Sequence, residues 1–135
     1  MIVLDTNVVS ELMRDAPDSQ VLAWINSAGR LHTTAVTLAE VGLGIARLPQ
    51  GQRKDRLAVA AAQVFADFDE VIVPFDARAA RRYAEIVVGR ERAGRPIAAA
   101  DAQIAAICSS RRATLATRNT SDFQATGIAL LNPWG

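Results

Sequence analysis

The sequence has little of several residue types on which common functional sites depend. Its 135 residues include one cysteine, Cys108, and one histidine, His32. A lone cysteine cannot form an internal disulfide, and this pair cannot build a Cys/His zinc site. Aromatic residues make up 5% of the chain, which argues against the stacking platforms that grip single-stranded nucleic acid. Disulfide scaffolds and zinc fingers are therefore excluded, and the cysteine content fits a reducing compartment.

An excess of charge of one sign and a long apolar run are also missing. The formal net charge is +1, so any polyanionic partner must be held by local arginines or by a metal ion. Arg14, Arg47, Arg118 and the cluster Arg90, Arg92 and Arg95 are candidates for phosphate contacts, although most surface arginines are simply solvated. The apolar start of the chain meets Asp5 at once, unlike a signal peptide, and no run approaches a membrane span. We therefore expect a cytoplasmic protein without a membrane contact.

The remaining composition suits one compact domain over residues 1–135, because half of the residues are hydrophobic and can bury a core. Short, largely apolar runs at 2–4, 31–36, 71–73, 114–116 and 129–131 predict strands. They alternate with predicted helices at about 7–13, 18–25, 37–48, 53–68, 76–92 and 97–111. This order predicts an α/β fold, a three-layer α/β/α sandwich with a mainly parallel central sheet, whose ligands bind beyond the carboxyl ends of the strands.

Four acidic residues stand at the edge or on the face of apolar segments, and Asp101 is the clearest of them. At 3.6 residues per turn it shares one helical stripe with Ile97, Ile104 and Cys108. Burying an unpaired carboxylate is costly, so a purely structural role would need a nearby arginine or several amide donors. We therefore favour a functional role for Asp101.

The other three acids have plausible structural roles as well. Asp5 follows the first strand, where parallel sheets place their chemistry, but it could equally be a helix N-cap. Glu40 lies three residues after Thr37, the spacing of a capping box. Asp122 lies in a turn after a predicted strand. Because all four positions converge on one edge of a parallel α/β fold, we interpret Asp5, Glu40, Asp101 and Asp122 as one acidic site for a divalent cation.

Four segments then resemble a known family. They are residues 1–11 (MIVLDTNVVSE), residues 37–40 (TLAE), Arg95-Pro96-Ile97 leading to Asp101, and residues 115–119 (LATRN) leading to Asp122. Together, in order and spacing, they resemble the PIN-domain ribonucleases, with the VapC-type toxins of the FitB-like branch as the nearest likeness. The resemblance runs nearly from end to end of the chain.

The resemblance implies a metal-dependent endoribonuclease that acts as the toxin of a toxin-antitoxin pair. Asp5, Glu40, Asp101 and Asp122 fall on the acidic quartet, which is both catalytic and metal-binding. Thr6, Asn7, Thr117 and Asn119 match supporting polar positions. Some relatives place an acid at the position of Asn119, so the way in which Asp122 contacts the metal, directly or through water, stays open.

The chemistry and partners follow from the same resemblance. Oxygen ligands suit Mg²⁺ or Mn²⁺, which can activate a water for hydrolysis of an RNA phosphodiester. The expected partners are RNA, a second copy in a homodimer, and a cognate antitoxin whose tail covers the acidic pocket. Promoter DNA is expected to be bound only through the antitoxin.

Three rival hypotheses belong to other classes. A HAD-like phosphatase needs a second aspartate two residues after the first, where this chain has Asn7. A receiver-type signalling module needs a lysine after a strand, whereas Lys54 falls in a predicted helix. A catalytically silent PIN-like protein that binds or regulates a partner is the third, and intact acids argue against it.

Overall fold

The part of the chain that the structure describes forms five short strands, and these run parallel to one another. The computed structural model describes residues 1–68 and 72–135. Within them, one sheet has the order β1-β4-β5 and a second pairs β2 with β3, and every strand pairing is parallel. A parallel bridge between Val3 and His32 connects the two sheets. The strands are β1 (Ile2–Leu4), β2 (Thr33–Thr34), β3 (Ile72–Val73), β4 (Thr114–Ala116) and β5 (Ala129–Leu131).

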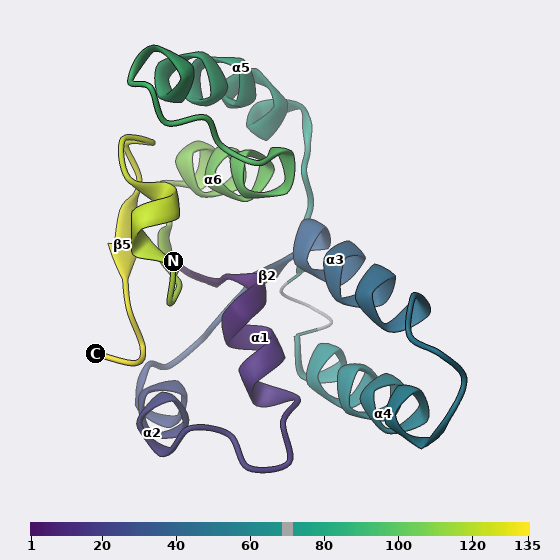
Figure 1. The fold of residues 1–135 in the computed structure, drawn as a ribbon. Coiled ribbons are helices and arrows are strands. Elements are labelled where there is room, and N and C mark those ends of the chain that lie inside the picture. Colours follow the sequence, from purple (N-terminus) through teal and green to yellow (C-terminus); the bar gives the residue numbers. More distant parts are fainter. Residues whose placement is uncertain (69–71) are drawn as a thin grey trace.

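Helices follow the strands along the chain, as the alternating pattern predicts. Figure 1 shows α5 and α6 lying together on one side of the strands, with α1 and α2 on the other side and α3 and α4 forming a neighbouring pair. No helix in the described ranges is both long and apolar enough to cross a membrane. The helices are α1 (Thr6–Leu12), α2 (Ser19–Ser27), α3 (Ala35–Ala46), α4 (Gln52–Asp67), α5 (Ala77–Arg92), α6 (Ala99–Arg111) and the 3₁₀ helix η2 (Thr120–Phe123).

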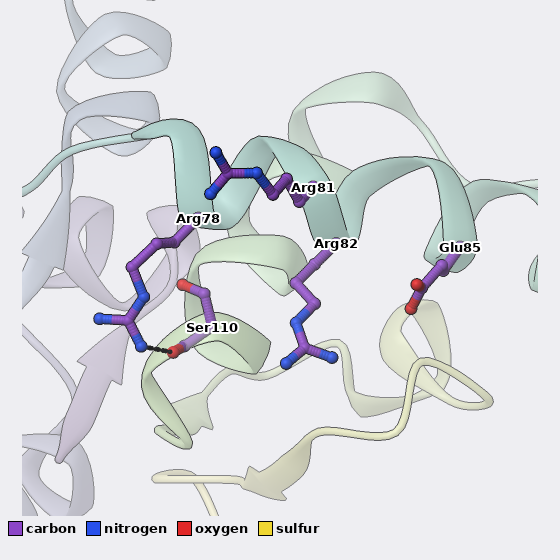
Figure 2. A pocket seen from close by; sticks show the side chains of 5 residues that line it. All are labelled: Arg78, Arg81, Arg82, Glu85 and Ser110. Atoms are coloured by element: carbon purple, nitrogen blue, oxygen red, sulfur yellow. Dashed lines mark hydrogen bonds between the residues drawn. The ribbon is translucent and has the colours of Figure 1, made fainter.

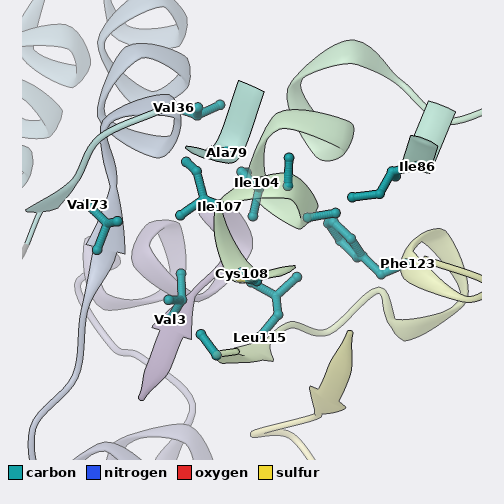
Figure 3. Close-up of a cluster of buried hydrophobic side chains, with 13 residues drawn as sticks. Val3, Val36, Val73, Ala79, Ile86, Ile104, Ile107, Cys108, Leu115 and Phe123 are labelled. Carbon is teal, nitrogen blue, oxygen red and sulfur yellow. The ribbon is translucent and has the colours of Figure 1, made fainter. Parts of the chain in front are cut away.

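Two hydrophobic cores, one on each face of the sheet, confirm the predicted three layers. Successive residues of a strand point to opposite faces. Val3 and Leu115 therefore pack with α5 and α6 in one core (Figure 3). Leu4 and Ala116, the next residues of the same strands, pack in the other core with residues of α1, α2 and α4. The expected α/β/α sandwich with a parallel sheet is thus present, and α6 is nearly surrounded by core.

The predicted boundaries are wrong at the starts of three helices. The run 31–36 was expected to be a strand, but only Thr33–Thr34 forms one, next to the bridge at His32. The run ends there because the Thr34 hydroxyl accepts from the Thr37 amide and caps a helix that starts at Ala35. The helix expected from residue 97 starts at Ala99. The helix expected from about residue 7 starts at Thr6, because Asp5 caps it. The first residue of the strand expected at 71–73 lies outside the described residues.

Candidate active site

Asp5 joins the end of β1 to the start of α1, where it caps the helix. Its side chain is 4% exposed. Oδ1 accepts from the Thr6 amide at 2.8 Å, while Oδ2 accepts from the Thr117 hydroxyl at 2.7 Å and lies 3.4 Å from Nδ2 of Asn7. Burial raises the pKa of Asp5, the hydrogen bonds from Thr117 and Thr6 oppose this, and the charges of Glu40 and Asp122 add to it. The residue that caps α1 is thus also a buried acid with a raised pKa.

Glu40 lies on the second turn of α3 and makes no capping box. The Thr37 amide is already satisfied by the Thr34 hydroxyl at 3.0 Å, so the predicted reciprocal pair of Thr37 and Glu40 is absent. Instead, the Thr6 hydroxyl donates to Oε1 of Glu40 at 2.7 Å and lies 3.1 Å from the Thr37 hydroxyl. These bonds join α3 to α1 and turn the Glu40 carboxylate toward Asp5, which favours the functional interpretation.

A polar network holds the end of β4 against the start of α1. The Asn7 amide group donates to the Thr117 hydroxyl at 3.2 Å and accepts from the Arg118 backbone amide at 3.2 Å. The Asn119 amide also donates to the Thr117 hydroxyl, at 3.1 Å. Thr117 is fully buried, so its hydroxyl is fixed in place. The structure therefore brings together all the polar residues that were expected to support the acids.

Asp101 occupies the first turn of α6 and is half-buried. Ile104 and Cys108, its neighbours on the helical stripe, are completely buried. Burial is the largest cause that raises the pKa of Asp101 to about 6, followed by the charges of Asp5, Glu40 and Asp122, while Arg90 lowers it. The predicted acid on an apolar helix face is present, and the other three acids of the quartet are close enough to influence it.

Asp122 stands apart from the other three acids. It lies in η2, and its side chain is exposed. Its charge nevertheless raises the pKa of both Asp5 and Asp101. Asn119, at the start of the same turn, lines the acidic cavity, whereas Asp122 does not. The geometry thus leaves Asp122 near the site but outside its lining.

An open cavity of about 430 Å³ collects these groups. Sequence reasoning assigned no role to two of its lining residues, Ser10 and Glu11. Glu11 is buried, accepts from the Asp18 amide at 3.0 Å and pairs with Arg14 at 3.0 Å. The three-residue spacing of Glu11 and Arg14, at and just beyond the end of α1, could have indicated their ion pair. The lining residues are Asp5, Thr6, Asn7, Ser10, Glu11, Arg14, Glu40, Asp101 and Asn119.

The donor set of this cavity fits a hard divalent cation. Carboxylate, hydroxyl and amide oxygens are what Mg²⁺ and Mn²⁺ prefer. None of the four acids takes part in an ion pair within residues 1–68 and 72–135. Hydrogen bonds to Asp5 and Glu40 and the charge of Arg90 near Asp101 therefore oppose their mutual repulsion only in part. Over the same ranges, no three His, Cys, Asp or Glu side chains lie in an arrangement that could hold one ion. Acids that repel one another spread apart, so a cation would have to draw these side chains together.

A second cavity, of about 300 Å³, lies between α5 and α6 and has a structural explanation. Figure 2 shows the guanidinium of Arg78 beside Ser110, where it donates to the Ser110 carbonyl oxygen at 3.0 Å. That carbonyl belongs to the last turn of α6, which leaves acceptors unsatisfied. Because Asp101 lies at the other end of α6, this basic cavity is separate from the acids. Its lining residues are Arg78, Arg81, Arg82, Glu85 and Ser110.

Comparison with known families supports the resemblance noted in the sequence. The family model of the PIN domain matches residues 2–128. A VapC ribonuclease of Sinorhizobium fredii is 40% identical, with 99% of this chain and 98% of the relative covered. The toxin FitB of Neisseria gonorrhoeae is 41% identical, with 99% of each chain covered.

Solved structures extend this similarity to three dimensions. A structure of FitAB bound to a DNA fragment matches with a TM-score of 0.89 and 40% identity, covering 100% of this chain and 96% of the other. A crystal structure of a FitA–FitB complex from Neisseria gonorrhoeae matches with a TM-score of 0.88 and 41% identity, covering 99% of each chain. Both fold and sequence therefore agree over nearly the full length.

Proposed function

This chain belongs to the PIN-domain family, in its VapC-type toxin branch, and from this premise we propose that it is a metal-dependent endoribonuclease and the toxin of a toxin-antitoxin pair. Its substrate is RNA, and its reaction is hydrolysis of a phosphodiester bond. The phosphatase and receiver hypotheses are set aside, because the family match covers residues 2–128.

One observation carries the proposal, namely the convergence of Asp5, Glu40 and Asp101 on one cavity. These acids come from the end of β1, from α3 and from α6, far apart in the sequence. None of them has an ion-pair partner within the described residues, as a purely structural buried acid would need. Instead Asp101 has a pKa of about 6, raised by burial and by the other acids. Perturbed acids clustered in a cavity are typical of functional sites.

The cation proposed for this site is Mg²⁺ or Mn²⁺, held by Asp5, Glu40, Asp101 and Asp122. When bound, it supplies Lewis-acid stabilisation of phosphate charge and lowers the pKa of a coordinated water. A polyanionic RNA could not otherwise approach a cavity lined by uncompensated carboxylates. The donor set and the raised pKa of Asp101 support this assignment.

The chain's own residues orient the acids. Thr117 and Asn7 donate to Oδ2 of Asp5, so this carboxylate keeps one orientation, and Thr6 does the same for Oε1 of Glu40. Such outer hydrogen bonds commonly fix the direction of metal-binding carboxylates. Arg14 is a positively charged residue in the cavity lining, and its side chain is 65% exposed. We assign it to contact a phosphate of the RNA at the cavity edge.

The proposal extends to partners. The relatives solved as FitAB include a complex bound to DNA. By analogy, this chain pairs with a cognate antitoxin that covers the acidic cavity, forms a homodimer, and reaches promoter DNA only through the antitoxin. The match of fold and sequence over nearly the whole chain supports this extension.

The proposal is tested by RNA cleavage with purified protein and its Asp101→Asn variant. Each is assayed on structured RNAs with Mn²⁺, with Mg²⁺ or with excess chelator, and circular dichroism checks the fold. We expect cleavage by the wild type with either metal, no cleavage with chelator, and loss of more than about 100-fold in the variant. Full metal-dependent activity in a folded Asp101→Asn variant would overturn the proposed site.

A further inference from the structure

We propose that Arg90 is a positioning residue of the acidic site. Its side chain holds the turn that carries Asp122 against the start of α6. This inference rests on the proposed function, because it assigns Arg90 a role in assembling the same acids. Arg90 lies in the last turn of α5, is not among the residues that line the cavity, and forms no ion pair within the described residues.

The contacts of Arg90 join three separate segments. Its side chain is 4% exposed. Nη1 donates to the carbonyl oxygen of Asp122 at 2.5 Å, and Nε donates to the carbonyl oxygen of Arg95 at 2.6 Å. The Arg95 amide in turn donates to the Arg90 carbonyl at 2.9 Å. One planar guanidinium therefore ties the end of α5 to the loop that leads into α6 and to the turn η2.

The burial of this charge needs a reason beyond packing. A buried guanidinium is costly, and well-packed apolar side chains often serve a core equally well or better. Within the described residues, Arg90 takes part in no ion pair, and its donors are directed at backbone carbonyls instead. Two carbonyls in a fixed geometry suit the planar fork of arginine and would not be matched by lysine. The two hydrogen bonds of the Arg90 guanidinium therefore fix the position of the η2 turn relative to the end of α5.

Arg95 makes a second, outer connection to the same turn. Its Nη1 donates to Oε1 of Gln124 at 2.9 Å, and its Nη2 donates to the Ser121 carbonyl at 3.0 Å. Together the two arginines hold the backbone on both sides of Asp122. The burial of Arg90 also argues against the phosphate contact expected of it. Arg95 is exposed, so the same expectation stays a prediction for Arg95.

The turn needs such support because Asp122 is the exposed member of the quartet. Asp5 and Asp101 are held by β1 and α6, whereas Asp122 lies on a four-residue 3₁₀ helix. The carbonyl bonded by Arg90 belongs to Asp122 itself, so a shift of this contact moves the carboxylate directly. The charge of Arg90 also influences Asp101, which agrees with a guanidinium close to both acids.

A double-mutant cycle tests this inference with Mn²⁺ as the probe. The variants are Arg90→Gln, Asp122→Asn and their combination, with Arg81→Gln as control because Arg81 is an exposed arginine of the same helix. Calorimetric titration gives the Mn²⁺ dissociation constant, and cleavage assays give kcat and KM. Residues that act through one another are non-additive, whereas independent ones are additive.

We expect Arg90→Gln to weaken Mn²⁺ binding by about 10-fold in the wild-type background and by less than about 2-fold in the Asp122→Asn background. The fall in cleavage should appear in kcat rather than in KM. Arg90→Lys should keep the defect, since it retains the charge without the fork. An equal loss in both backgrounds, or full rescue by lysine, would overturn the inference.

A second variant covers the case in which Arg90→Gln does not fold. Arg95→Gln removes only exposed bonds to Ser121 and Gln124, and it should weaken Mn²⁺ binding about 3-fold, again only when Asp122 is present. No effect of Arg95→Gln would then count against the inference. Asp101→Asn distinguishes failure of the proposed function from failure of this inference. If the Asp101→Asn variant keeps its Mn²⁺ binding and cleavage, the proposed site is refuted. If that variant loses both, but the effects of Arg90→Gln and Asp122→Asn are additive, only the role of Arg90 is refuted.

Discussion

The hydroxyl of Thr117 donates to Oδ2 of Asp5 at 2.7 Å, and this bond joins the carboxyl ends of the neighbouring parallel strands β4 and β1. Both residues are buried. The bond opposes the rise in the pKa of Asp5 that burial causes, so it favours the charged form that binds a cation. A residue without an acidic or basic group thereby helps to set the charge of the site.

Replacing Thr117 by valine removes the hydroxyl but keeps the shape of the side chain, so this variant should bind the metal more weakly and still fold. We expect the free energy of unfolding to fall by about 1 kcal/mol, and Mn²⁺ affinity and kcat to fall about 10-fold. The matched control is Thr33→Val, because Thr33 is equally buried and its hydroxyl bonds the Leu4 carbonyl rather than an acid. Calorimetry with Mn²⁺ should show the affinity loss in Thr117→Val alone, and equal losses would contradict the assigned role.

Glu40 and Thr34 should separate metal binding from helix capping. Because Thr34 caps α3 and Glu40 does not, Thr34→Ala should cost about 1 kcal/mol of folding free energy. Glu40→Gln should leave stability nearly unchanged while it lowers Mn²⁺-dependent cleavage by about 100-fold. Denaturant unfolding and cleavage assays measure the two effects. A destabilised Glu40→Gln variant with normal cleavage would return Glu40 to a structural role.

Asp101 should make the metal-free protein less stable as the pH rises. Its pKa is raised from 3.8 to about 6 in the folded protein, so between these values the folded state binds more protons than the unfolded state. Stability is then lost with increasing pH across that window. Asp101→Asn removes the effect, so we expect the variant to equal the wild type near pH 4 and to exceed it by about 2 kcal/mol above pH 6, after allowance for partial exposure.

Mn²⁺ should make the wild type more stable than the Asp101→Asn variant, the reverse of the order expected without metal. A ligand present at 100 times its dissociation constant stabilises the folded wild type by about 2.7 kcal/mol, whereas Asp101→Asn should gain much less. Denaturant unfolding of both proteins at pH 4, 5, 6 and 7, with chelator and then with Mn²⁺ at pH 7, measures both effects. A constant difference between the two proteins across this pH series would show that Asp101 is not a destabilised acid.

The sheet and the acids could be predicted because each has a local sequence signal. Apolar runs such as 2–4 and 114–116 are directly followed by polar residues. This pattern is typical of buried parallel strands that carry a functional site at their carboxyl ends. The start of α3 could not be predicted, because Thr34 and Thr37 are both acceptable caps. Pairing of Thr33–Thr34 with β3 fixes the strand, and it thereby decides which threonine caps the helix.

Arg90 shows a different limit of sequence reasoning. An arginine in the last turn of an amphipathic helix is normally expected to be solvated and to interact favourably with the helix dipole. Its partners are backbone carbonyls, one of them at Asp122, 32 residues away. Backbone acceptors carry no residue-type signal, so no pattern of side chains could reveal this contact. The bond from the backbone amide of Asp18 to the Glu11 carboxylate likewise has no signal in the pattern of side chains.

Asp122 and Asn119 should prove partly interchangeable. Asp122 is exposed and outside the cavity lining, whereas Asn119 lines the cavity, so Asp122→Asn should lower kcat by only about 10-fold, less than Asp101→Asn. Asn119→Asp places a carboxylate of the same shape directly in the lining. In the Asp122→Asn background it should therefore restore most of the lost Mn²⁺ affinity and cleavage. Asn119→Ser, which adds no charge, is the control. If the aspartate gives no more recovery than the serine, position 119 does not reach the cation and Asp122 alone completes the quartet.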